Sequence, residues 1–373
     1  MLDQPRIDAL FDWMVGGALP PSPMPVNVAK LLEGLNEAGV VIDRFALFIM
    51  TLDPKVAGKR ITWTPNEGVE VLNAPHEFFL SDYFKQSPAA HVYESGDTLR
   101  CCFARGDETD FDDLNDLRDN GVTDYYAQPM VYSGRETHSM TWSTSAAGGF
   151  TDGMIAAFDR LNPAIARLLE IYVLKINTIS ILDTYVGRNA GAQVLDGHVE
   201  RGDLERIPSV ILFADLVGFT ALSNMRPPEE VLSILNGYFS AVETAVQSGG
   251  GEILKFIGDG ILAIFPIRDD EAAAAQRALG AIDEALAASE TPFRAALHVG
   301  EVLYGNIGGE SRLDFTAIGP AVNLTARILG HAETAGAELV CSEPFAAHAK
   351  GRAALTGEVS LKGFEGAQAV YSL

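Results

Sequence analysis

Two aspartates in the second half of the chain stand where carboxylates can act on one ligand. Asp215 closes the apolar run 210–214, and Asp259 lies at the tip of a Gly-Asp-Gly turn. Two carboxylates at neighbouring strand ends repel each other and need a compensating cation. Such oxygen ligands suit Mg²⁺, which binds well together with a phosphorylated substrate. The structural alternative is that Asp215 caps a helix and Asp259 is an ordinary hairpin turn residue.

Three further polar residues accompany the two aspartates. Lys255 interrupts an apolar strand four residues before Asp259 and is one of only three lysines after residue 200. Asn323 and Arg327 are four residues apart on a predicted helix, so both side chains point to the same side. The alternatives are a solvated lysine on an edge strand and a surface pair at a helix start.

The elements that must position these residues follow a recognisable order. Apolar spacing predicts the strand 210–214, the helix 229–246, a hairpin over 252–265 that pivots on Gly258-Asp259-Gly260, the helix 271–288 and the strand 293–299. The order β-α-β-β-α-β belongs to the ferredoxin-like plan, with helices on one face of an antiparallel sheet. In that plan Asp215 and Asp259 lie side by side on neighbouring central strands.

Three sequence motifs around these residues resemble those of the class III adenylate/guanylate cyclase family. They are Phe213-Ala-Asp-Leu-Val-Gly-Phe-Thr220, Gly251-Glu-Ile-Leu-Lys-Phe-Ile-Gly-Asp-Gly260 and Thr316-Ala-Ile-Gly-Pro-Ala-Val-Asn-Leu-Thr-Ala-Arg327. The resemblance covers about residues 207–373. It implies an α+β, ferredoxin-like cyclase catalytic domain that forms a homodimer with its active sites at the subunit interface.

The resemblance also implies a role for each site residue. Asp215 and Asp259 would hold two Mg²⁺ or Mn²⁺ ions, with the carbonyl of Leu216 as an extra ligand. By the same resemblance Asn323 would orient the ribose and Arg327 would stabilise charge on the α-phosphate. Lys362, in the stretch Leu361-Lys-Gly-Phe364, lies near the family's phosphate-binding lysine. The implied reaction converts ATP to 3′,5′-cyclic AMP and pyrophosphate.

Base selection rests on Lys255 and Thr316. A lysine ammonium only donates hydrogen bonds, so it suits adenine N1 and not the N1–H of guanine. Thr316 occupies the place where many relatives carry an aspartate paired with this lysine, and its hydroxyl discriminates less. The Lys–Thr combination resembles the class IIIb subgroup, whose characterised members make cyclic AMP and often respond to bicarbonate. Two alternatives stay open: a nucleotide-binding regulatory module without turnover, and a cyclase for GTP or a pyrimidine nucleotide.

The first part of the chain predicts a separate regulatory domain and a connecting helix. Residues 1–155 hold predicted strands at 45–50, 60–64, 126–132 and 138–143 and a helix at 28–35, an α+β layout similar to GAF or PAS sensor modules. Residues 156–206 form a helical linker in which apolar residues follow a seven-residue repeat. They are Ile165, Leu168, Tyr172, Ile179, Leu182 and Val186, with Lys175 between them. This predicts a parallel coiled coil that transmits regulation; the alternative is one amphipathic helix packed on the first domain.

Composition limits the compartment and the partners. The 373 residues carry a net charge of −23, which disfavours nucleic acid and anionic membranes as partners. Three cysteines, Cys101, Cys102 and Cys341, are too few for a disulfide framework and favour a reducing compartment. No apolar run is long enough for membrane insertion, so we expect a cytoplasmic protein. Beyond ATP and a second copy of the chain, the expected partner is a small-molecule effector or bicarbonate.

Overall fold

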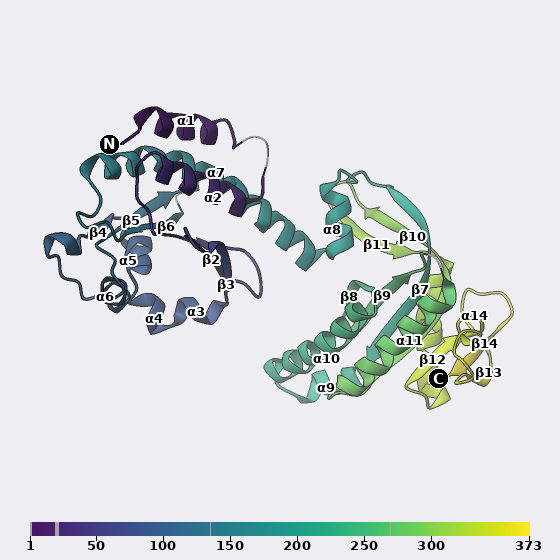
Figure 1. Cartoon of the computed structure of the whole chain (residues 1–373). Helices are drawn as coiled ribbons and strands as arrows, with labels where there is room; N and C mark the ends of the chain where they lie inside the picture. The colour runs from purple at the N-terminus through teal and green to yellow at the C-terminus, as the bar shows by residue number, and fades with distance from the viewer. Residues whose placement is uncertain (1, 19–21, 135, 269) are drawn as a thin grey trace. The chain divides into compact units, whose positions relative to one another are not determined.

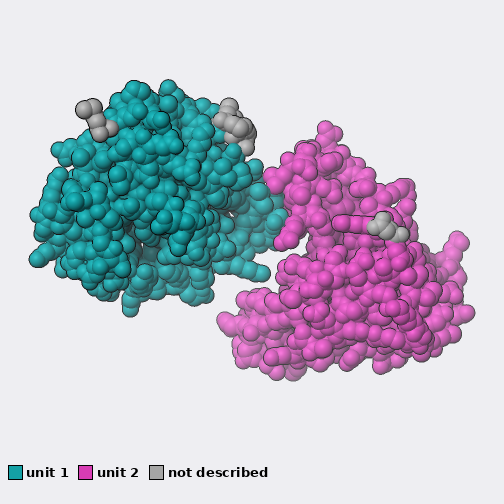
Figure 2. Space-filling model, viewed as in Figure 1, with its two compact units in different colours: residues 1–184 teal, residues 185–373 magenta. Residues whose placement is uncertain are grey.

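The chain folds into two compact units. The computed structural model describes residues 2–18, 22–134, 136–268 and 270–373. Unit 1 is Met1–Thr184 and unit 2 is Tyr185–Leu373 (Figure 2). The boundary lies inside the segment 156–206 that the sequence predicts as a linker. None of the described helices is both long and apolar enough to cross a membrane.

Unit 1 is built on a six-stranded antiparallel sheet in the order β3-β2-β1-β6-β5-β4. Its strands are β1 (Arg44–Met50), β2 (Gly58–Thr64), β3 (Gly68–Ala74), β4 (Leu99–Cys101), β5 (Asp124–Val131) and β6 (Thr137–Thr144). Its helices are α1 (Gln4–Val15), α2 (Met24–Glu37), α3 (His76–Leu80), α4 (Asp82–Lys85), α5 (Pro88–Ser95), α6 (Asp112–Asp119), α7 (Asp152–Tyr185) and the 3₁₀ turn η1 (Phe103–Arg105). The α+β class and the strands and helix predicted for this region are confirmed.

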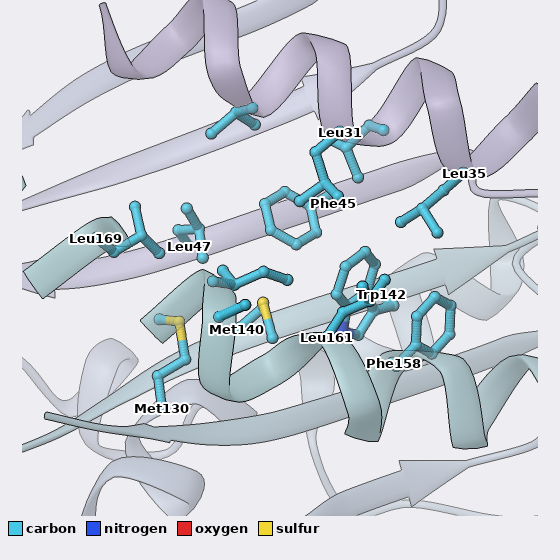
Figure 3. Packing of buried hydrophobic residues seen from close by; sticks show 14 of the residues in the cluster. Leu31, Leu35, Phe45, Leu47, Met130, Met140, Trp142, Phe158, Leu161 and Leu169 are labelled. Atoms are coloured by element: carbon cyan, nitrogen blue, oxygen red, sulfur yellow. The ribbon is translucent and has the colours of Figure 1, made fainter. Parts of the chain in front are cut away.

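The main core of unit 1 lies between one sheet face and the helices α1, α2 and α7 (Figure 3). The fully buried Trp142 stacks on Phe158 of α7, with ring centroids 4.3 Å apart and planes 11° from parallel. Ile165 is buried in the same core, and Leu168 and Tyr172 pack against it. The first half of the predicted heptad stripe is therefore one face of an amphipathic helix packed on its own domain, the alternative given above. A coiled coil formed by the later positions stays a prediction.

Unit 2 contains an eight-stranded sheet with the main path β13-β14-β12-β10-β7-β9-β8, and β11 pairs with β10. Its strands are β7 (Leu204–Leu216), β8 (Glu252–Ile257), β9 (Gly260–Pro266), β10 (Phe293–Gly308), β11 (Leu313–Ile318), β12 (Leu339–Ser342), β13 (Ala354–Ser360) and β14 (Ala367–Ser372). Its helices are α8 (Arg188–Leu195), α9 (Phe219–Met225), α10 (Pro228–Ser248), α11 (Glu271–Ala288), α12 (Pro320–Leu329), α13 (Ala332–Ala335) and α14 (Glu343–Ala346) (Figure 1). The predicted order appears as β7, α10, β8, β9, α11 and β10, so the ferredoxin-like plan is confirmed.

The two faces of the unit 2 sheet have different cover. Leu212 and Ala214 of β7 point into the core under α10 and α11. Because successive side chains of a strand alternate between faces, Ile211 points the other way and packs with residues of α8 and α12. Asp215 continues the row of Ile211, so its carboxyl group leaves the sheet on the face away from α10 and α11.

A buried carboxylate holds the start of α8 against the sheet. Glu252 accepts hydrogen bonds from the backbone N–H of Asn189 at 3.1 Å, its side-chain amide at 2.9 Å and the Tyr304 hydroxyl at 3.0 Å. Gly187, just before the helix, has φ of +98°, a conformation that favours glycine. A negative charge at a helix N-terminus also complements the helix dipole. The beginning of α8 is thus tied to β8 and β10.

Candidate active site

The fold brings Asp215 and Asp259 together. Strands β7 and β9 pair with Ala214 opposite Ile261, which places the β8–β9 turn beside the end of β7. Gly258 in this tight turn has φ of +64°, a left-handed conformation that glycine adopts without the steric cost of a side chain. A Cβ atom on Gly260 would lie 3.8 Å from a carboxyl oxygen of Asp215. The neighbourhood expected from the ferredoxin-like plan is therefore present.

The two carboxyl groups interact strongly. Burial, the hydrogen bond with Asp259 and the charge of Asp259 together raise the pKa of Asp215 to about 7. The buried Tyr238 hydroxyl of α10 has no hydrogen-bond partner among the described residues, and burial, together with the charges of Asp215 and Asp259, raises its pKa. The raised pKa means that proton uptake relieves the repulsion between the two carboxylates, and a bound metal cation would relieve it as well.

This donor set fits a divalent cation that arrives with further oxygen ligands. Within residues 2–18, 22–134, 136–268 and 270–373 no three His, Cys, Asp or Glu side chains form a metal cluster. Two carboxylates with open coordination positions suit Mg²⁺, which commonly binds through one or two carboxylates, waters and substrate phosphates. Leu216, the third predicted ligand through its carbonyl, is a buried residue at the end of β7.

The ammonium of Lys255 pairs with a residue that the sequence analysis missed. Lys255, on β8, forms an ion pair with Asp314 of β11. Thr316, the expected counterpart, is two residues farther along β11 and is 6% exposed. Residues two apart on a strand project from the same face, so this spacing is the signal by which Asp314 could have been found. The lysine is half-buried and its carboxylate partner is exposed.

The remaining predicted residues lie elsewhere on unit 2. Asn323 and Arg327 are both exposed on α12, whose inner side packs through Val322, Thr325 and Ile328. Their common side of the helix is as predicted. Lys362 is exposed in the turn before β14. In the described part of the chain no hydrogen bond or ion pair joins these three side chains to the carboxylate pair.

Most of unit 2 is similar to a known family of catalytic domains. Residues 204–373 match the model of the adenylate and guanylate cyclase catalytic domain. The matched region contains the eight-stranded sheet and the three motifs described above, in agreement with the resemblance that the motifs carry. The matched region does not include α8.

Curated relatives share the same region. An uncharacterised protein of Mycobacterium tuberculosis is 34% identical over 166 residues, which is 42% of this chain and 30% of that protein. Adenylate cyclase 1 of Rhizobium meliloti is 32% identical over 152 residues, 37% of this chain and 23% of that protein. The chain thus spans about a quarter to a third of the length of these relatives.

Solved structures similar to the chain include both adenylyl and guanylyl cyclases. The adenylyl cyclase CyaB from P. aeruginosa is 23% identical, covers 45% of this chain and 94% of its own, and has a TM-score of 0.39. The guanylyl cyclase Cya2 is 30% identical, with coverages of 45% and 92% and a TM-score of 0.38. A bacterial light-regulated adenylyl cyclase is 20% identical, covers 70% of this chain and 87% of its own, and has a TM-score of 0.46.

Proposed function

We propose that unit 2 converts ATP to 3′,5′-cyclic AMP and pyrophosphate. The observation that carries the proposal is the Asp215–Asp259 pair, in which burial and mutual repulsion raise the pKa of Asp215 to about 7. Two carboxylates held this close repel each other, and a divalent cation that also binds phosphate oxygens relieves this repulsion. The family of residues 204–373 supplies the reaction class.

The chain's own residues would bind and orient the nucleotide. Mg²⁺ or Mn²⁺, two ions per site on Asp215, Asp259 and the Leu216 carbonyl, would neutralise the triphosphate and favour ionisation of the ribose 3′-hydroxyl. The 3′ oxygen would then form a bond to the α-phosphorus while the bond from that phosphorus to the oxygen bridging to the β-phosphate breaks. Pyrophosphate would leave with this oxygen, and the 3′-hydroxyl proton would pass to water. Asn323 would hold the ribose in line for this displacement.

Cationic side chains would bind the phosphates from a second copy of the chain. Arg327, always charged and planar, would bind oxygens of the α-phosphate as their charge grows, and Lys362 would contact the outgoing pyrophosphate. Both are exposed, and neither contacts the carboxylate pair within the described residues of one copy. This separation supports a homodimer in which one subunit supplies the carboxylates and the other supplies Asn323 and Arg327.

The ion pair of Lys255 with Asp314 supports adenine as the base. An ammonium has three N–H donors, so the contact with Asp314 leaves donors for adenine N1. The carboxylate also fixes the direction of a long, flexible side chain. Guanine presents a donor at N1, for which the ammonium of Lys255 itself offers no acceptor. The hydroxyl of Thr316 would complete the base contacts as donor or acceptor.

A turnover assay with each of four nucleoside triphosphates and Mg²⁺ or Mn²⁺ tests the function. We expect cyclic AMP from ATP and much less product from GTP, CTP and UTP, with light scattering showing a dimer at the assay concentration. ATP binding in calorimetry without any product would instead show a regulatory nucleotide-binding module. A preferred product other than cyclic AMP would keep the reaction class and overturn the base assignment.

A further inference from the structure

The sheet of unit 1 buries a polar face as well as an apolar one. Alternation along β1 sends Phe45 and Leu47 into the main core and Arg44 to the opposite face. Cross-strand pairing continues the polar face, because Arg60 lies opposite Phe48 and Ser143 lies opposite Arg44. Apolar residues usually fill a sheet face that is covered by helices, so this face needs a different explanation.

A cavity of about 220 Å³ lies on this polar face. It is bounded by strands of the sheet and by residues of α4, α5 and α6, and it is smaller than the sites of about 300–1,000 Å³ that hold drug-sized ligands. Its lining combines cations with aromatic rings, among them Arg44, Arg60, Phe48, Phe84, Tyr83 and Tyr125.

The two arginines in this cavity have no partner in the described part of the chain. The Nε atom of Arg60 is buried without a hydrogen bond, and no hydrogen bond or ion pair involves the Arg44 side chain. The two guanidinium groups also repel each other: burial, in the first place, and the charge of Arg60 lower the pKa of Arg44, although Tyr125 and Asp113 act in the opposite direction. Both arginines are half-buried, and partial burial without an ion pair is unfavourable for a cation, so the pair is suited to a negative ligand.

Other buried polar atoms on the same sheet face are unsatisfied as well. The hydroxyl groups of Thr62, Ser139 and Ser143 have no hydrogen-bond partner in the described residues. All three belong to the face of Arg44 and Arg60 by strand register, with Thr62 opposite Ala46 and Ser139 opposite Phe48. Native proteins rarely leave several buried polar atoms unpaired in one place without a ligand or water there.

The acidic groups of the cavity do not neutralise the arginines. Asp113 and Asp116 of α6 line the cavity, but within the described residues neither lies within 4.0 Å of a guanidinium nitrogen. Asp113 acts on Tyr83, where its charge and hydrogen bond add to burial in raising the pKa of the phenol. The charge of Asp113 also raises the pKa of Arg44, but no ion pair in the described residues occupies either guanidinium, so both can still pair with a negative ligand.

We propose that this cavity binds a small organic anion, a carboxylate on an aromatic or similarly apolar body. A guanidinium fork matches a planar carboxylate in bidentate geometry, and the rings of Phe48, Phe84 and Tyr125 suit the apolar body. The cavity volume limits the ligand to a small metabolite. This site belongs to unit 1 and stands independently of the reaction proposed for unit 2.

Ligand-dependent thermal stability of the full chain tests the site. The probes are phenylacetate, its cationic counterpart 2-phenylethylamine and inorganic phosphate. We expect phenylacetate to raise the unfolding midpoint of unit 1 in a saturable way, and the amine to have no effect. An equal response to the amine would overturn the charge assignment, and an equal response to phosphate would overturn the apolar body. No response to either anion would overturn the site.

The variant Arg60→Met separates binding from structure. It should weaken phenylacetate binding at least about tenfold in calorimetry, and in anion-free buffer its unfolding midpoint should rise because a repulsive buried charge is gone. The matched control Arg105→Met removes an exposed arginine of the same unit and should change neither value. Unchanged phenylacetate affinity, or a lower midpoint without anion, would show that Arg60 is structural and would overturn the proposal.

Discussion

The acidic pair of unit 2 and the basic pair of unit 1 are two solutions to the same electrostatic problem. Asp215 and Asp259 meet at a strand end and a turn, whereas Arg44 and Arg60 lie beneath helices in a cavity of about 220 Å³. Asp215, Arg44 and Arg60 lie on the sheet faces away from the main cores, and in each pair the two like charges repel each other. The sign of the charge selects the ligand's charge, and the degree of enclosure limits the ligand's size.

The two pairs differ in how they relieve repulsion when no ligand is bound. A carboxylate pair can take up a proton, and the pKa of Asp215, raised to about 7, favours this as the pH falls below neutrality. A guanidinium stays protonated at every accessible pH, so Arg44 remains charged even though burial lowers its pKa. The basic pair therefore retains its full repulsion in the free protein.

The largest expected effect is loss of turnover on neutralising the acidic pair. Asp259→Asn keeps the size of the side chain and removes one charge that binds the cations, so we expect turnover to fall on the order of 1,000-fold, about 4 kcal/mol of activation free energy. Steady-state cyclic AMP formation measures this. Asp196→Asn, at an exposed aspartate of the same unit, is the control and should retain turnover. Full activity of Asp259→Asn would exclude the pair from catalysis.

Lys255→Ala tests base recognition in unit 2. Loss of a hydrogen bond from a charged donor costs about 1.5–3 kcal/mol, so kcat/KM for ATP should fall roughly 10- to 100-fold while that for GTP changes little. Competition assays with both nucleotides give the ratio. Arg312→Ala, which removes a nearby exposed cation, serves as the control. Equal losses for ATP and GTP would mean that the lysine binds phosphate or supports the fold.

The stability of the metal-free protein compares the two pairs directly. Because the pKa of Asp215 is raised in the folded state, the folded protein binds more protons than the unfolded chain between about pH 4 and pH 7. Stability from this group is therefore lost as the pH rises through that window. Asp259→Asn should reduce this loss, so its advantage over the wild type grows toward pH 7.

Arg60→Met should instead stabilise by an amount that is independent of pH. Thermal midpoints of both variants with a chelator, measured from pH 4 to pH 8, would show the difference. A pH-dependent gain for Arg60→Met would contradict the view that the basic pair cannot titrate.

The smallest effect is expected for Asp314→Asn. Its ion pair with Lys255 is largely exposed on the carboxylate side, and such pairs contribute about 0–1 kcal/mol to stability. The unfolding midpoint should hardly change, whereas KM for ATP should rise a few-fold because the lysine loses its fixed direction. Paired thermal and kinetic measurements separate the two. A lower KM would show that Asp314 competes with the base for Lys255.

Local pattern was enough to predict the centre of unit 2. The apolar strand before Asp215, the glycines around Asp259 and the helix carrying Asn323 and Arg327 each appear in a short stretch of sequence. Their order then leads to the ferredoxin-like plan, and the plan places the two aspartates together.

Contacts between residues far apart in the sequence were not predicted from local pattern. Asp314 lies 59 residues from Lys255 and approaches it only after β8 and β11 fold, so its two-residue spacing from Thr316 is the one sign of it in the sequence. Arg44 and Arg60 occupy the polar positions of an alternating strand pattern, which normally predicts a solvent-exposed face. The sequence therefore did not predict that helices cover them. The stripe of α7 suits either its own domain or a second helix, and only packing assigns Ile165 to the domain.

The hydrogen bonds of Glu252 have a practical consequence for chimaeras. The family match starts at residue 204. A transplanted module that began there would lack Asn189, and the Tyr304 hydroxyl would be the one remaining hydrogen-bond donor to Glu252 among the three described above. A module that starts no later than Gly187 keeps the two hydrogen bonds from Asn189 to Glu252. Engineers who wish to fuse this enzyme module to a foreign input should therefore place the splice ahead of that glycine.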